Sequence, residues 1–147
     1  MVSQIRTYGA EPQNMSHEFV SHHSGVDVNE HSVTVVFSRD PNDERSVDGL
    51  VLQRSKDPGE DVPGIAGVYV EIPIQRFAVY GGITEALLRR DSFILRFDDT
   101  TAHRMGGLHQ ILVRFDLSDP EFTSIRDAIH FVFTGCSSFR EAHEATG

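Results

Sequence analysis

Short segments in which apolar and polar residues alternate recur along this chain and constrain its fold more than any other feature. In residues 31–38, Val33, Val35 and Phe37 alternate with polar residues, and a period of two places them on one face of a β-strand. Strands are predicted in the same way at 49–55, 67–72, 75–80, 83–88, 91–97 and 109–117, and a weaker one at 17–28. This pattern is typical of an antiparallel sheet with one face in water.

Two segments have helical features instead. Residues 98–105 are predicted to form a short helix, with Asp98 or Asp99 as its N-cap and Gly106-Gly107 as its end. An amphipathic helix is predicted over 119–134, because Phe122, Ile125, Ala128, Ile129, Val132 and Phe133 recur at helical spacing. The fold class is therefore α+β: a mainly antiparallel sheet of about six to eight strands with both helices packed on it.

Turn formers and composition suggest the boundaries of the domain. Residues 1–16 are polar and aperiodic and should form a flexible arm, 17–135 a single domain, and 136–147 a tail. Within the tail, the capping-box pattern of Ser138 and Glu141 predicts a helical stub. Gly81-Gly82 predicts a hairpin turn or a bulge, since glycine adopts positive φ freely.

Charge and composition narrow the possible partners. Thirteen Lys and Arg against 22 Asp and Glu give a formal charge of −9, which disfavours nucleic acid and anionic membranes and favours a basic partner. The same charge also serves solubility, and that interpretation stays open. The first residues lack the apolar core of a signal peptide, and Cys136 is the single cysteine, so we expect a cytoplasmic protein without a disulfide.

Catalytic and cofactor signatures do not appear in the sequence. It contains neither a G-x-S-x-G nucleophile elbow nor a glycine-rich phosphate loop, so we predict no catalytic residues, no metal and no cofactor. Two alternatives stay open. One is a small-ligand or metal-binding module that uses His23 and His31 of the histidine-rich segment 17–31, and the other is a hydrolase whose residues converge only in three dimensions.

Several side chains on the predicted strands are candidates for contact with a partner. Arg54 should share the face of its apolar neighbours, and Glu71 is a candidate carboxylate for its guanidinium. Arg54 could form a structural ion pair with Glu71 or contact a binding partner, and both interpretations stay open. Tyr69, Phe77 and Tyr80 are candidate aromatic anchors of an interface, and Phe77 suits a core position equally well.

The order of these features resembles the immunity protein 10 (Imm10) family of bacterial immunity proteins. The resemblance covers about residues 31–134 and rests on order and spacing. Its motifs are Leu52-Gln53-Arg54, Tyr69-Val70-Glu71, Tyr80-Gly81-Gly82-Ile83, Phe93–Phe97, a short helix ending at Gly107-Leu108, the strand 111–115 and the closing helix.

The resemblance implies a cytoplasmic antitoxin that binds and neutralises the toxin domain of a polymorphic toxin system, without catalysis. The matched positions Gln53, Arg54, Glu71 and Gly82 suit either a role in the fold or contact with the toxin. Charge leads us to expect a basic toxin domain that contacts the acidic loops 40–48 and 57–61. The candidate toxin-binding residues are Asp40, Asp43, Glu44, Glu60, Asp61, Arg54, Glu71 and Tyr69.

Overall fold

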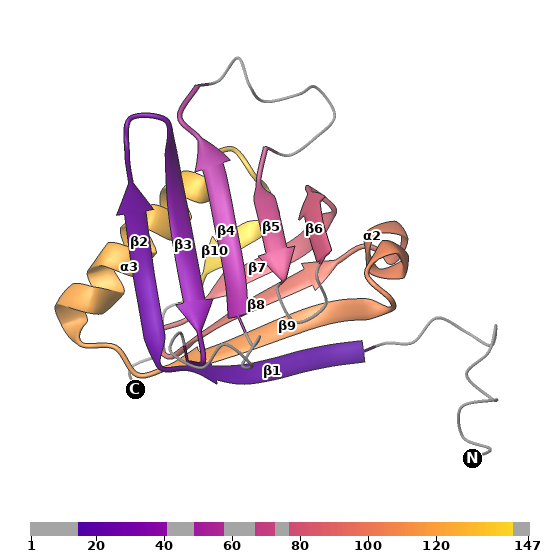
Figure 1. The fold of residues 1–147 in the computed structure, drawn as a ribbon, viewed down its shortest axis with the longest axis horizontal. Coiled ribbons are helices and arrows are strands. Elements are labelled where there is room, and N and C mark those ends of the chain that lie inside the picture. The colour runs from indigo at the N-terminus through magenta and orange to yellow at the C-terminus, as the bar shows by residue number, and fades with distance from the viewer. Residues whose placement is uncertain (1–14, 41–48, 58–66, 73–76, 143–147) are drawn as a thin grey trace.

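Two five-stranded sheets and two helices make up the part of the chain that the computed structural model describes, residues 15–40, 49–57, 67–72 and 77–142. Sheet A has the order β1 (Met15–Ser21), β9 (Leu108–Phe115), β8 (Ser92–Phe97), β7 (Ile83–Leu88) and β10 (Phe139–Glu141). Sheet B has the order β2 (His23–Val28), β3 (Ser32–Ser38), β4 (Gly49–Ser55), β5 (Tyr69–Ile72) and β6 (Phe77–Tyr80). In Figure 1, sheet B lies in front and the strands of sheet A cross behind it. The predicted α+β class is confirmed, but the strands form two sheets and not one.

Both predicted helices are present, and the short one begins at its predicted cap. α2 spans Asp99–Arg104, and the side chain of Asp98 accepts a hydrogen bond from the Thr101 amide. α3 spans Asp119–Val132 and begins with a capping box between Ser118 and Glu121. In the part of the chain that the structure describes, no helix is long and apolar enough to cross a membrane.

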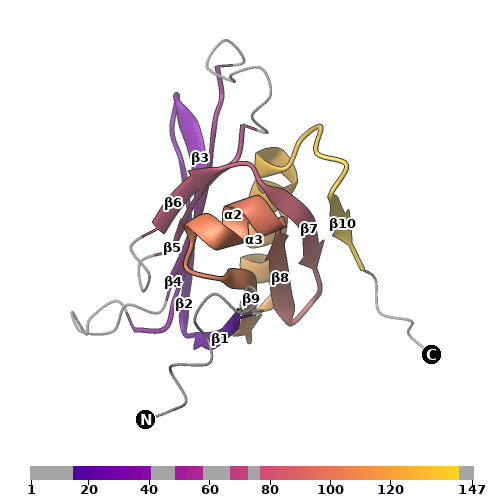
Figure 2. The ribbon, with the colours of Figure 1, turned by 90° about the vertical axis from the view of Figure 1, so that its right-hand side faces the viewer.

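An aromatic cluster joins the two sheets and α3. The ring of Phe37 on β3 stacks on Phe93 and Phe115 of sheet A, with centroids 6.2 and 5.6 Å apart, and Phe93 contacts Phe133 at the end of α3 at 6.1 Å. All four rings are buried, among aliphatic side chains from the inner faces of both sheets. Figure 2 shows the sheets nearly edge-on, with α2 at the end that faces the viewer and α3 farther back. The core therefore lies between the sheets, and each sheet keeps an outer face.

The predicted strand 17–28 is in fact two strands that belong to different sheets. β1 pairs in parallel with β9 in sheet A, and β2 pairs antiparallel with β3 in sheet B. The chain changes sheets at His22, beside the buried Ser21, whose hydroxyl lies within hydrogen-bond distance of the His23 and Ser38 carbonyls, at 3.0 and 3.3 Å. The Ser21 side chain thus provides a hydrogen-bond partner for these backbone carbonyls at the point where the pairing of β2 with β3 ends. The turn predicted at Asn29 and Glu30 does connect β2 to β3.

The glycine pair carries the chain from one sheet to the other and forms no hairpin. Gly81 and Gly82 have φ of 73° and 77°, and they connect β6 of sheet B to β7 of sheet A. The Gly82 carbonyl accepts the Asp98 amide at 2.9 Å, next to the start of α2. A Cβ on Gly82 would lie 2.0 Å from Oγ1 of Thr101. Gly82 is therefore required both for its backbone conformation and for the close approach of α2.

The predicted tail belongs to the domain up to residue 142. Instead of a helical stub, residues 139–141 form β10, which pairs in parallel with β7. Glu141 lies within hydrogen-bond distance of Arg126 Nε at 3.1 Å and of His130 Nε2 at 2.7 Å, both on α3, and the Phe139 ring stacks on Phe133 at 5.3 Å. These contacts need α3 in place, so the local sequence alone did not indicate the strand.

Replacing Gly82 should destabilise the fold more than replacing a glycine of the same conformation in open space. Gly135 also has φ of 77°, but no atom lies within 4 Å of the position that a Cβ would take there. We expect Gly135→Ala to cost about 1–2 kcal/mol from backbone strain. Gly82→Ala adds the clash with Thr101 and should cost about 1–3 kcal/mol more. Urea unfolding of the two variants measures the difference, and equal costs would contradict the close packing of Gly82 on α2.

Candidate functional site

The outer face of sheet A is crossed by a chain of hydrogen bonds that reaches all five strands. Arg140 donates to Glu85 Oε2 at 2.6 Å, and Arg96 donates to the other oxygen of Glu85. Arg96 Nε also donates to Gln110 at 2.7 Å, and Gln110 donates to the Ser16 hydroxyl at 3.2 Å. We call these five residues the polar ladder. Its charged groups satisfy one another within the chain.

The carboxylates of this face are held by basic side chains. Hydrogen bonding from Arg140 first, together with Arg96, lowers the pKa of Glu85 despite the opposing effect of burial. Nearby, Arg114 Nε donates to Glu18 at 2.7 Å, from β9 to β1. Sheet A thus uses its surface charge for contacts between its own strands.

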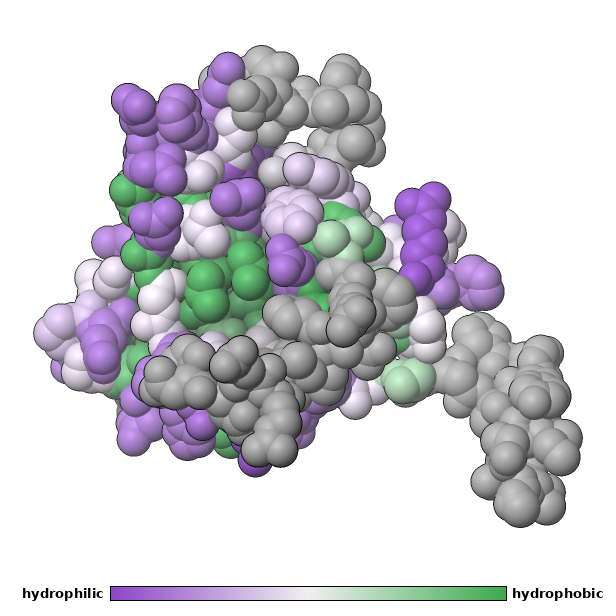
Figure 3. All heavy atoms as spheres, in the orientation of Figure 1, coloured by the Kyte–Doolittle hydropathy of each residue, from purple (hydrophilic) through white to green (hydrophobic). Residues whose placement is uncertain are grey.

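The outer face of sheet B differs, and we call it the open face. Strand register places two rows of side chains on it: Gly25, Val36, Val51, Glu71 and Ala78, and beside them Asp27, Thr34, Gln53, Tyr69 and Tyr80. Sheet A and α3 pack against the opposite side, so no described helix or strand covers this face. Figure 3 shows hydrophobic surface near its centre with hydrophilic residues around it.

Apolar side chains in the middle of the open face are exposed to solvent. Val36 is 36% exposed, and Val51 beside it on β4 is partly exposed. Both residues interrupt the alternation of their strands, since each follows or precedes an inward-facing apolar neighbour. That interruption is the sequence signal for a second apolar face, and the sequence interpretation missed it.

A tyrosine pair and a carboxylate lie at the β5 and β6 side of the open face. Tyr69 and Tyr80 are directly paired across the two strands, with ring centroids 5.1 Å apart, and Tyr80 is 62% exposed. The Tyr69 hydroxyl donates to Glu71 Oε1 at 3.0 Å. Burial first, and then Glu71, raises the pKa of Tyr69, so the phenol remains a donor at neutral pH. We call Tyr69, Glu71 and Tyr80 the tyrosine cluster.

The candidate residues that the structure describes lie in three places. Tyr69 and Glu71 share the open face, whereas Arg54 lies on the inner face with Leu50 and Leu52, so the expected ion pair between Arg54 and Glu71 is wrong. Asp40 follows the end of β3 and is partly buried. Asp43, Glu44, Glu60 and Asp61, and the side chain of Phe77, lie outside the described part of the chain.

The two acidic loops leave sheet B at opposite ends of β4. One loop connects β3 to Gly49 at the start of β4, and the other follows Ser55 at its end. Seven residues of strand separate these points, which is roughly 20 Å at ~3.3 Å per residue. A single partner that touches both loops would therefore have to extend along the open face.

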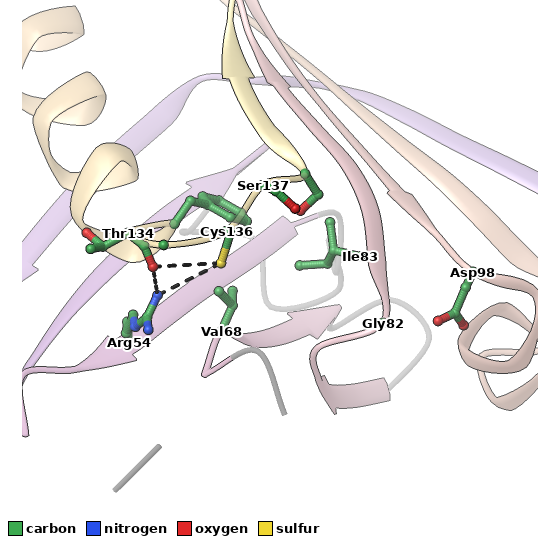
Figure 4. A pocket seen from close by; sticks show the side chains of 11 residues that line it. Arg54, Val68, Gly82, Ile83, Asp98, Thr134, Cys136 and Ser137 are labelled. Atoms are coloured by element: carbon green, nitrogen blue, oxygen red, sulfur yellow. Dashed lines mark hydrogen bonds between the residues drawn. The ribbon is translucent and has the colours of Figure 1, made fainter. Parts of the chain in front are cut away.

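Arg54 binds the end of α3. Its Nη1 donates to the carbonyl oxygens of Val132 at 3.1 Å and Thr134 at 2.6 Å, and lies 3.9 Å from the sulfur of Cys136. The last carbonyls of a helix have no partner within the helix and carry its negative dipole end, so a guanidinium is well suited to them. Figure 4 shows Arg54 reaching Thr134 and Cys136. Arg54 therefore has a structural role that joins β4 to α3.

A cavity of about 530 Å³ lies beside this contact. Its lining includes Arg54, Ile83, Asp98 and Cys136. In Figure 4, Asp98 lies on the other side of Gly82 from Arg54 and Cys136. Hydrogen bonds from the amide and side chain of Thr101 lower the pKa of Asp98, which identifies it as a helix cap. No histidine is among the lining residues that the structure describes. The described lining therefore places no histidine beside Cys136 or Ser137.

His23 and His31, the pair named in the metal-binding alternative, do not lie together. His23 pairs with Ser38 at one end of the β2–β3 hairpin, and His31 lies in the turn at the other end. Strand geometry separates them by roughly 20 Å. Across the described ranges of the chain, no three His, Cys, Asp or Glu side chains form a group that could hold a metal.

The described surfaces define a small α+β domain with one internally paired face and one face open to contact. The family model of immunity protein 10 matches residues 20–123, and the chain belongs to this family of immunity proteins. The match begins within β1, so it includes more of the histidine-rich segment than expected, and it ends early in α3, before β10. A search of curated proteins found no match.

Removing the Arg54 guanidinium should destabilise the domain. Arg54→Met keeps most of the apolar stem but loses the hydrogen bonds to Val132 and Thr134, and we expect a cost of about 1–2 kcal/mol. Arg54→Lys keeps one charged donor and should cost less. Urea unfolding at neutral pH compares the variants, and wild-type stability of Arg54→Met would contradict the structural role.

The polar ladder should make stability depend on pH in the acid range. Because the folded-state pKa of Glu85 is lowered, its stabilisation is present above the ordinary glutamate pKa and is lost as pH falls through the folded value. Glu85→Gln should therefore be less stable than the wild type at neutral pH, with a difference that shrinks on acidification. Denaturant unfolding over a pH series measures this, and a difference independent of pH would contradict the prediction.

Proposed function

We propose that this immunity protein binds a cognate secreted toxin domain in the cytoplasm and neutralises it. Membership of the immunity protein 10 family is the observation that carries the proposal. Neutralisation requires only that the bound protein block the toxin, so no catalytic group is needed in the immunity protein. We propose no enzymatic activity and no cofactor.

The open face is the proposed contact surface. It combines exposed apolar side chains such as Val36 with the aromatic ring of Tyr80, and aromatic residues are enriched where interfaces gain their binding energy. Tyr69 and Glu71, both candidates from the sequence, lie on it. The outer face of sheet A is the weaker candidate, because its charged groups already pair across strands.

The acidic loops extend the proposed surface at both ends of β4. Asp40, Asp43 and Glu44 belong to the loop before β4, and Glu60 and Asp61 to the loop after it. With a net charge of −9, the chain would attract a basic toxin domain and speed its association at low salt. Arg54 is left out of the proposed surface because it faces the core side of sheet B.

Growth rescue tests the proposal directly. The chain is expressed in cells together with a candidate toxin domain, sought in the genes adjacent to its own, and survival is compared with cells that express the toxin alone. We expect growth to be restored, and the purified chain to form a stoichiometric complex with an inactivated form of the toxin domain. An unrelated toxin is the control and should still kill. Killing by the adjacent toxin at full expression of the folded chain would contradict the proposal.

A further inference from the structure

Glu71 differs from the other glutamates on the described strands in the side chain that its carboxylate contacts. Glu18 pairs with Arg114 at 2.7 Å, Glu85 with Arg140 and Arg96, and Glu141 with Arg126 and His130. Glu71 instead accepts a hydrogen bond from a neutral phenol, that of Tyr69. Among the described strands, it is the glutamate whose negative charge no basic side chain balances.

The position of Glu71 makes this charge available to a partner. It lies on the open face, directly opposite Val51 on β4 and Ala78 on β6. The Tyr69 hydroxyl holds Oε1 at 3.0 Å and so fixes the orientation of the carboxylate, while no described side chain donates a hydrogen bond to Oε2. A carboxylate positioned in this way meets an incoming donor without losing much side-chain freedom.

Tyr80 adds an aromatic surface next to this carboxylate. It is 62% exposed and lies across the strand pair from Tyr69, with the two ring planes at 52°. The face of a tyrosine ring attracts cations, and the planar guanidinium of arginine both stacks on rings and donates to carboxylate oxygens. The tyrosine cluster thus presents the two features that recognise an arginine side chain.

We propose that the tyrosine cluster receives an arginine side chain of the toxin domain, which stacks on Tyr80 and pairs with Glu71. This inference rests on the proposed function and makes its contact surface specific. The arginine would supply a cation, which no described side chain gives Glu71, and the surrounding Val51 and Ala78 would exclude water from the pair when the partner docks.

Binding of the inactivated toxin domain to matched variants tests the inference. Tyr80→Ala should weaken the affinity about tenfold or more, and Glu71→Gln about three- to tenfold, with the Glu71 effect shrinking at high salt. Glu18→Gln is the matched control, because it makes the same change on the outer face of sheet A and should leave affinity unchanged. Thermal unfolding checks that every variant is folded.

Each outcome separates the inference from the proposed function. If the wild type binds the toxin domain and Tyr80→Ala and Glu71→Gln bind equally tightly, the inference is overturned while the proposed function stands. If Glu18→Gln weakens binding and the tyrosine-cluster variants do not, the contact belongs to sheet A and the inference also fails. If the folded wild type does not bind the toxin domain at all, it is the proposed function that fails.

A titration that needs no toxin tests the recognition chemistry by itself. N-acetyl-arginine amide is added to the protein, and NMR follows the ring protons of Tyr69 and Tyr80. We expect saturable shifts confined to the tyrosine cluster, lost in Glu71→Gln and kept in Glu18→Gln. Equal shifts with N-acetyl-lysine amide would overturn the specificity for arginine, because the cluster would then recognise any basic side chain. The absence of a localised shift in the wild type would overturn the whole inference.

Discussion

The contact of Phe37 with Phe93 and Phe115 is the interaction on which the rest of the structure depends. It places the inner faces of sheets A and B against each other, and the further contact of Phe93 with Phe133 fixes the end of α3 between them. Phe139 then stacks on Phe133 and brings β10 to the edge of sheet A. Because this cluster occupies both inner faces, the described sheets leave their outer faces to a partner.

Periodicity in the sequence predicts most individual elements but not how they associate. Alternation identifies Val33, Val35 and Phe37 as buried, and the caps of α2 and α3 follow from local chemistry at Asp98 and Ser118. Alternation does not say which sheet a strand joins. Positive φ at Gly81 and Gly82 suits a hairpin as well as a crossing between sheets, and β10 depends on contacts with α3 that are distant in sequence.

For the candidate residues too, the local sequence predicts which face of a strand a side chain occupies, whereas its contacts depend on residues that are distant in the sequence. A period of two puts Tyr69 and Glu71 on one face of β5 and Arg54 on the core side of β4, and that parity alone argues against the predicted ion pair. The true partners of Arg54 are carbonyls at the end of α3, 78 and 80 residues away, for which no local pattern exists. The meeting of Tyr69 with Tyr80 likewise requires the register of β5 and β6.

The two outer faces differ in what they would offer the proposed toxin partner. Glu85 already has two arginine partners, so a toxin that contacted it would first have to compete with contacts within the fold. No described basic side chain pairs with Glu71, and a partner that covered it without a cation would bury a carboxylate held only by the Tyr69 hydroxyl, at a large cost. An interface centred on the tyrosine cluster would therefore discriminate mainly by penalising partners without a suitably placed basic side chain, which is how charged interface groups contribute specificity more than affinity.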